Sequence, residues 1–270
     1  MKNKKLSHNG LQGSVTSVMA ALLCILIGLI VGFLVLLAIN PAHAWADGFV
    51  RILKGGFHDA PYGVGKELAN AAPLIMTGLS VGFAFKTGLF NIGAAGQYTL
   101  GAYGALYCAI MLKLPWFVCL LAAAILGGLW GAIPGFFKAY FNINEVITSI
   151  MFNWIGLYLV NELVYQNGTG PMYDVRNTRT LNLGKNADLA QSVIPDFGLN
   201  KLFQTNSTTI AIFLAAAVAI LIWVVLNKTT FGYELKAVGL NKSAARYAGI
   251  NEKKNIILSM AIAGALAGFG

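Results

Sequence analysis

The stretch that decides the fold is VMAALLCILIGLIVGFLVLLAI, residues 18–39, in which 22 consecutive residues carry no charge. A helix needs about 20 such residues to cross the hydrocarbon core of a bilayer, at about 1.5 Å per residue. The hydrophobic region of a secretory signal peptide has only about 7–15 residues. Although Ala42-His43-Ala44 resembles a signal-peptidase site, the length of the run favours an uncleaved membrane span.

Comparable apolar runs recur along the chain, which has 270 residues, 57% of them hydrophobic and only 11% charged. A soluble domain of this length has about 25% charged residues. The sequence therefore predicts an all-α, polytopic transmembrane helical bundle with about seven spans. The predicted spans are residues 18–39, 67–85, 92–112, 116–137, 145–164 and 209–226, and one that begins near residue 255.

The basic residues predict how these spans are oriented. They precede the first span at Lys2, Lys4 and Lys5 and are densest in residues 228–254, and cytoplasmic segments are enriched in Lys and Arg. The formal net charge of +9 is spread between apolar runs, so it indicates membrane orientation and not nucleic-acid binding.

The resulting domain organisation has a cytoplasmic N-terminal tail, residues 1–17, followed by a transmembrane domain, residues 18–270. Its outer segments are residues 40–66 and 165–208, the latter with a short amphipathic helix around Asp188, and its main cytoplasmic loop is residues 227–254. The last span has too few residues before Gly270 to cross a bilayer, so we expect it to be incomplete and the natural chain to continue.

Several kinds of chemistry find no motif in the sequence. The three cysteines lie singly in apolar runs, and the three histidines have no metal-ligand spacing. The nearest match to a phosphate-binding P-loop, APYGVGKE at residues 60–67, lacks the first glycine and the final Ser or Thr. We therefore expect a chain that is not an enzyme, holds no metal and carries no ATPase motif of its own.

Glycines at small-xxx-small spacing predict where helices pack closely, because they let two backbones approach. Pro134 is predicted to kink its span. Together these residues favour a compact bundle. The spacing occurs at Gly28/Gly32, Gly78/Gly82, Gly127/Gly131/Gly135 and Gly264/Gly268.

The first of three polar turns is KTGLFNIGAAGQ, residues 86–97. Asn91 is predicted to cap the third span, and Gly93 and Gly96 leave the backbone amides of its first turn accessible. Gln97 follows within the span. Two interpretations stay open, namely a helix cap with one interhelical amide bond, or a polar element that lines a substrate path.

The second polar turn is NINEVITSIMFN, residues 142–153. Asn144 is predicted to cap the fifth span, and Glu145 in its first turn suits the positive end of the helix dipole. Asn153 lies deeper, where an amide needs a partner, so it is a candidate for lining a pore.

The third polar region, residues 229–254, is predicted to be an ordered loop. Asn241 is predicted to cap a short helix over residues 242–248, with Gly249 just past its end, and Asn251 to cap the last span. Residues 233–238 are predicted to form another helical turn, ended by Gly239. The loop is either an interfacial helix held by anionic lipid or a docking helix for a cytoplasmic partner.

Three segments, GLFNIGAAGQ, NEVITSIMFNWIGLYLVN and FGYELKAVGLNKSAARYAGI, together resemble permease subunits of bacterial ABC importers for nucleosides and simple sugars. These belong to a larger set that includes ribose and branched-chain amino-acid permeases, and the resemblance covers about Leu68 to Gly270. It implies a multi-pass protein of the bacterial plasma membrane, and the lysines before the first span predict a cytoplasmic N-terminus. The implied partners are two cytoplasmic ABC ATPase subunits, an identical or paralogous second permease subunit and an extracytoplasmic substrate-binding protein. ATP and Mg would lie on the ATPase subunits, with no cofactor in this chain.

The resemblance also implies two sets of site residues. Ala95 stands where family members commonly have Glu, so no role of that acid is transferred to this chain. The substrate-pathway candidates are Asn91, Gly93, Gly96, Gln97, Asn144, Glu145 and Asn153. The ATPase-coupling candidates are Glu234, Lys236, Asn241, Ala244, Ala245, Arg246 and Gly249.

The predicted function is nucleoside uptake by alternating access as part of an ATP-driven importer. A simple sugar such as ribose is the alternative substrate. A stand-alone secondary transporter is the alternative class, and it would be insensitive to changes in residues 241–249. A membrane enzyme would need a convergent acid–base cluster, which the sequence does not offer.

Overall fold

A computed structural model describes residues 3–57, 59–183 and 187–270, which form two compact units, residues 1–64 and 65–270. Five helices are long and apolar enough to cross a membrane. The predicted helical, multi-pass architecture is thus confirmed. A pair of two-residue antiparallel strands, β1 (Tyr173–Asp174) and β2 (Arg179–Thr180), was not predicted. Met1 and Lys2 of the predicted tail lie outside the described residues.

The first unit is built on α1 (Asn3–Ile39), which contains the first predicted span. Most side chains of residues 18–39 are exposed, as lipid contact would require. The ring of Phe33 contacts those of Trp45 and Phe49 at centroid distances of 5.6 and 4.9 Å, so the segment after α1 folds back on it. That segment contains α2 (Pro41–His43), η1 (Ala44–Phe49), α3 (Val50–Lys54) and η2 (Gly55–Phe57).

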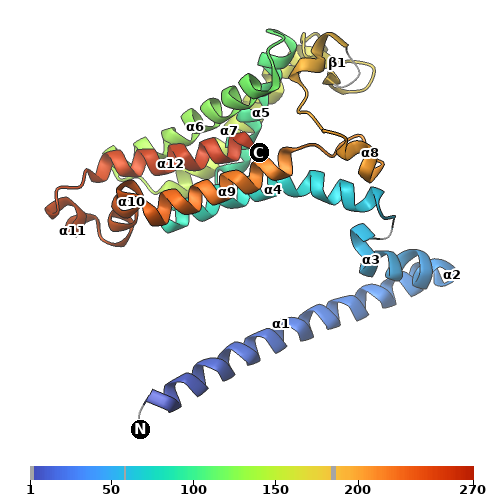
Figure 1. Ribbon diagram of the computed structural model, residues 1–270, viewed down its shortest axis with the longest axis horizontal. Helices are drawn as coiled ribbons and strands as arrows, with labels where there is room; N and C mark the ends of the chain where they lie inside the picture. Colours follow the sequence, from blue (N-terminus) through green and yellow to red (C-terminus); the bar gives the residue numbers. More distant parts are fainter. Residues whose placement is uncertain (1–2, 58, 184–186) are drawn as a thin grey trace. The chain divides into compact units, whose positions relative to one another are not determined.

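The second unit is a helical bundle with a short helical pair, α10 and α11, at one end and the strand pair at the other (Figure 1). The chain passes from the first unit into the second within α4. The helices are α4 (Tyr62–Lys86), α5 (Ala94–Ile110), α6 (Trp116–Phe141), α7 (Glu145–Tyr165), α9 (Ala211–Lys228), α10 (Thr230–Leu240), α11 (Lys242–Tyr247) and α12 (Glu252–Phe269).

The predicted count of about seven spans is not confirmed. The five candidate spans are residues 18–39 of α1, with α4, α6, α7 and α9. Helix α5 has only 17 residues, and α12 carries three charged residues, 252–254, in its first turn. Both helices nevertheless pack within the bundle, with buried residues along their length.

Helices α6 and α12 lie side by side with their backbones in contact (Figure 1). A Cβ atom built on Gly127 would lie 2.5 Å from the Gly264 carbonyl oxygen, and one on Gly131 would lie 2.5 Å from that of Met260. A Cβ on Gly268 would lie 2.4 Å from the Ala123 carbonyl oxygen. The predicted close packing is therefore confirmed for these two spans, since only glycine permits such an approach.

The same spacing marks no helix contact within the described chain at two other places. A Cβ built on Gly28, Gly32, Gly78 or Gly82 would meet no other atom within 4 Å. Glycine is common in membrane helices, so its spacing alone does not identify a partner. Pro134 lies inside α6, which continues as a helix to Phe141.

An apolar interior joins α4, α9 and α12. Met76 and Phe83 of α4 and Ala263 of α12 are at most 2% exposed, and Ile222 of α9 lies in the same cluster. Leu235 of α10 belongs to it as well and is 1% exposed. The loop helix α10 is therefore held by the same interior as the spans.

The predicted outer segment 165–208 contains short helical turns and the strand pair. The turn η5 (Ala187–Ser192) coincides with the helix expected around Asp188, although it is a 3₁₀ helix. The Thr208 hydroxyl donates to the Gly65 carbonyl oxygen at 3.0 Å and the Ser192 hydroxyl to that of Leu114 at 2.5 Å, so the segment is fastened to the bundle. The other helical turns are η3 (Gln166–Gly168) and α8 (Leu199–Phe203).

The α6–α12 contact predicts a contrast between two glycine-to-alanine changes. We expect Gly131→Ala to destabilise the protein by about 1–3 kcal/mol. The new methyl group would clash with backbone atoms of α12, which cannot rotate away as a side chain can. Gly78→Ala should leave stability unchanged or raise it slightly, because its surroundings are open. Thermal unfolding midpoints of the two purified variants in detergent check this. Equal midpoints would contradict the packing.

Candidate functional site

The turn between α4 and α5 contains a buried pair of amides. Asn91 and Gln97 are each 1% exposed. The Asn91 Nδ2 group donates to Gln97 Oε1 at 2.8 Å, and the Gln97 Nε2 group donates back to Asn91 Oδ1 at 3.0 Å. A second Asn91 Nδ2 hydrogen bond reaches Ser80 Oγ on α4 at 3.1 Å. Each buried amide thus has hydrogen-bond partners inside the protein, as buried polar groups generally do.

The prediction that Asn91 caps the third span is wrong. Helix α5 begins at Ala94, and its N-cap residue is Gly93, which offers no side chain. Asn91 lies two residues earlier, and its side chain turns inward to Gln97. A hydrogen bond between amides is present, but it joins Asn91 of the turn to Gln97 of α5 and not one helix to another. Lining of a substrate path by either residue stays a prediction.

The N-terminus of α5 is capped from a different helix. The Gly96 N–H, which has no partner within its own helix, donates to Asn153 Oδ1 of α7 at 2.5 Å. A Cβ on Gly96 would lie 2.7 Å from the Asn153 Cα, and one on Gly93 would lie 3.2 Å from the Ser149 carbonyl oxygen. The two glycines are therefore what allows α7 to approach closely enough for Asn153 to act as a cap. Its pore-lining role stays a prediction.

Sequence reasoning missed two serines of this region, Ser80 and Ser149. Ser149 is fully buried, and within the described part of the chain its hydroxyl has no hydrogen-bond partner. Ser149 precedes Asn153 by four residues, which places both on one face of α7, so helical spacing could have indicated it. No comparable signal marks Ser80.

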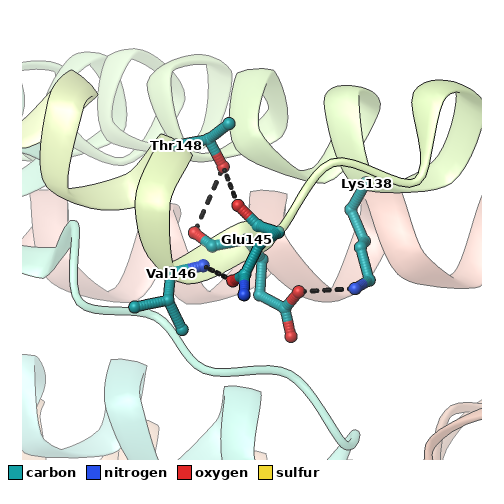
Figure 2. Close-up of polar contacts among 5 residues, drawn as sticks. Lys138, Glu145, Val146 and Thr148 are labelled. Atoms are coloured by element: carbon teal, nitrogen blue, oxygen red, sulfur yellow. Dashed lines mark hydrogen bonds and ion pairs between the residues drawn. The ribbon is translucent and has the colours of Figure 1, made fainter.

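The elbow between α6 and α7 contains an ion pair and a capped helix end (Figure 2). The Lys138 Nζ lies 2.7 Å from Glu145 Oε2, and both side chains are largely buried, at 16% and 15% exposure. The Asn144 Oδ1 accepts a hydrogen bond from Val146 N at 2.8 Å. The predictions that Asn144 caps α7 and that Glu145 lies in its first turn are both confirmed.

The loop between α9 and α12 is ordered largely as predicted. Asn241 accepts from Ala244 N at 3.0 Å and caps α11, and Asn251 accepts from Lys254 N at 3.1 Å and caps α12. Gly249 has φ +80°, the left-handed conformation expected just past a helix end. The prediction that Gly239 ends a short turn is wrong, because α10 runs through it to Leu240.

Gly239 instead brings α10 against the turn that leads to the amide pair. A Cβ on Gly88 would lie 2.5 Å from the Gly239 Cα, and one on Gly239 would lie 2.6 Å from the Thr87 carbonyl oxygen. Asn255 Nδ2 of α12 donates to Glu234 Oε2 of α10 at 3.3 Å. The loop and the turn therefore form one packed structure.

The predicted coupling residues divide into buried and exposed ones. Ala245 is 3% exposed and packs with Val238, Ile256 and Met260, so it fastens α11 to the bundle. The Lys236 Nζ donates to Asn227 Oδ1 at 3.0 Å. Glu234 is half-buried. The exposed members of the set are Asn241, Ala244, Arg246 and Gly249.

Two exposed apolar residues of this loop were missed by sequence reasoning. Leu240 is 89% exposed and Tyr247 is 94% exposed. Leu240 comes just before α11 and lines a groove of about 470 Å³ between α10 and α11, together with Tyr233 and Ala244, among others. Tyr247 is the last residue of α11 and does not line that groove. The break in helical pattern at Asn241 could have drawn attention to them. Among the described residues no cluster of His, Cys, Asp or Glu could hold a metal ion.

The amide pair predicts non-additive mutational effects. Asn91→Leu and Gln97→Leu should each lower stability by about 1–3 kcal/mol, because each leaves a buried amide without its partner. The double variant should lose less stability than the sum of the two single losses, because neither amide then remains buried without its partner. Thermal midpoints of the four proteins check this. Strictly additive losses would show that the two amides do not act as a pair.

Comparisons with known proteins agree with this architecture. Residues 65–270, which coincide with the second compact unit, match the family model described as branched-chain amino acid transport system, permease component. No solved structure shows a significant match to the chain.

Three relatives cover most of the chain. The guanosine ABC transporter permease protein NupP of Bacillus subtilis is 34% identical over 98% of this chain and 71% of its own length. The nucleoside ABC transporter permease protein NupB of Lactococcus lactis is 32% identical over 94% of this chain and 69% of its own. The glucose ABC transporter permease protein TsgB13 of Haloferax volcanii is 34% identical over 92% of this chain and 65% of its own length. The chain therefore belongs to the family of permease components of branched-chain amino acid transport systems.

Proposed function

We propose that this chain is the transmembrane permease of an ATP-driven importer that takes up nucleosides by alternating access. The observation that carries the proposal is its 34% identity, over 98% of its length, to a guanosine ABC transporter permease. A second nucleoside permease, at 32% identity over 94% of the chain, supports the same substrate class.

The loop formed by α10 and α11 supports a cytoplasmic protein partner. Leu240 and Tyr247 project from it almost fully exposed, and both lie outside the five candidate spans. Helix α11 has only six residues, too few for the extended apolar face by which an interfacial helix lies in a membrane. Exposed aromatic and leucine side chains on an ordered loop suit docking to a protein, where a few such residues carry most of the affinity.

The partners in this proposal are those of a complete importer. Two ABC ATPase subunits bind the loop and carry ATP and Mg. A second permease subunit, identical or paralogous, completes the pathway, and an extracytoplasmic binding protein delivers the substrate. The complex lies in the bacterial plasma membrane with the N-terminus of this chain in the cytoplasm.

ATP can drive transport only if closure of the ATPase pair favours one state of the permease over the other. The contact of Gly239 with Gly88 gives a physical route for this, because α10 cannot move far without moving the turn that holds Asn91. That turn in turn bonds to α4 and α5, so displacement of the loop is passed to the spans.

Two other functions remain as alternatives. A simple sugar is favoured by the 34% identity to a glucose permease, and it would need the same partners. A stand-alone secondary transporter would need no ATPase, but each of the three relatives named above is called an ABC transporter permease, which favours the ATP-driven class.

Uptake of radiolabelled guanosine and uridine, with and without this gene in the native host, tests the substrate. We expect deletion to reduce uptake at least several-fold, and excess unlabelled ribose to leave wild-type uptake unchanged, because recognition requires the base. Strong competition by ribose would instead support the sugar alternative. Undiminished uptake in a deletion strain that lacks other nucleoside carriers would refute the nucleoside assignment.

Substitution of an exposed leucine tests the ATPase contact. Leu240→Ser should reduce uptake and the transport-dependent ATPase rate by about tenfold or more, because loss of a central interface residue costs about 2 kcal/mol. Its matched control is Leu202→Ser in α8, which changes a leucine of 65% exposure in the segment predicted to face outward. Equal effects of the two changes would argue for a stand-alone transporter.

A further inference from the structure

A cavity of about 680 Å³ lies where α7 ends against the strand pair. The strand pair lies at the opposite end of the second unit from α10 and α11 (Figure 1). The cavity's volume falls within the range of about 300–1,000 Å³ that small-molecule sites occupy. The residues that line it include Tyr158, Asn161, Glu162, Tyr165, Tyr173 and Arg179.

Three tyrosine rings form one part of the lining. Tyr165 of α7 and Tyr173 of β1 meet edge to face, with ring centroids 5.1 Å apart and an interplanar angle of 81°. Tyr158 lies nearly two turns before Tyr165 on the same helix. Rings in this arrangement offer flat apolar surfaces together with hydroxyl groups, a combination that suits a planar heterocycle.

The polar part of the lining comes mainly from the same face of α7. Residues 158, 161, 162 and 165 follow the i, i+3, i+4, i+7 spacing of one helix face. The Asn161 amide and the Glu162 carboxylate form no hydrogen bond or ion pair with any other described residue. Arg179 lies across the strand pair from Asp174 and adds a cation to the cavity wall.

We infer that this cavity is a ribonucleoside-binding site at the outer mouth of the permease, an inference that rests on the proposed nucleoside import. The two oxygens of the Glu162 carboxylate accept hydrogen bonds from the 2′- and 3′-hydroxyls of ribose. The tyrosine rings contact the base, and the Asn161 amide and the Arg179 guanidinium bond to its polar edge. A simple sugar offers hydroxyls but no planar base for three rings.

The Glu162 assignment has a specific chemical consequence. A 2′-deoxyribonucleoside lacks one of the two hydroxyls, so it makes one bond fewer to the carboxylate. A hydrogen bond to a charged group contributes enough free energy to change binding by about tenfold or more. The site should therefore favour guanosine over 2′-deoxyguanosine, and the preference should depend on the charge of Glu162.

The experiment measures initial uptake rates of labelled guanosine and 2′-deoxyguanosine over a range of concentrations. A deletion strain of the native host carries the wild-type gene, Glu162→Gln, Arg179→Gln or the control Arg176→Gln. Arg176 lies in the same hairpin as Arg179 but does not line the cavity. The apparent KM is the readout because it does not depend on how much permease reaches the membrane.

We expect Glu162→Gln to raise the KM for guanosine about tenfold and that for 2′-deoxyguanosine by a clearly smaller factor, because the deoxynucleoside makes one hydrogen bond fewer to the carboxylate. Arg179→Gln should raise both, and Arg176→Gln should change neither. Equal KM changes for the two nucleosides in Glu162→Gln, or no change, would overturn the site while leaving nucleoside import intact. Absence of nucleoside uptake with the wild-type gene would overturn the proposed function and the site together.

Discussion

Lipid tails are as apolar as the side chains of a membrane helix, so hydrophobic burial alone does not bring two such helices together. What holds them is close packing, and here the closest packing is the backbone contact of α6 with α12. Gly268 of α12 lies against Gly127 of α6 and also against Gly101 of α5. A Cβ atom built on Gly101 would lie 2.5 Å from the Gly268 Cα. Three helices thus meet at one glycine, and the rest of the second unit is built around that junction.

The polar contacts complete this packing at one end of the bundle. The turn before α5 holds its amides inward, Asn153 caps α5 from α7, and α10 lies on Gly88. Leu89, Val238 and Ala245 share a small apolar core with α12. A loop that resembles an appendage in the sequence is therefore part of the folded bundle, which is what a loop needs if it is to transmit force.

Features set by neighbouring residues could be predicted from the sequence, whereas features set by distant partners could not. The caps at Asn144, Asn241 and Asn251 were predicted because an N-cap bonds to an N–H only two or three residues away. Asn91 was misassigned because its partners, Ser80 and Gln97, are brought to it only by folding. Likewise Gly239 resembled a helix end, since the reason for a glycine there is Gly88. The two-residue strands are too short for any periodic pattern, so the cavity beside them left no trace in the sequence.

Helix α7 runs unbroken from Glu145 to Tyr165, a length of about 30 Å. Its first residue pairs with Lys138, its middle holds the cap on α5 and its last turns line the cavity. A screw motion of a single residue along its own axis would turn every one of these groups by about 100°. Because α7 is one continuous helix, the elbow, the cap and the cavity cannot move independently. A shift or rotation of α7 at one of these places changes the other two by the same amount.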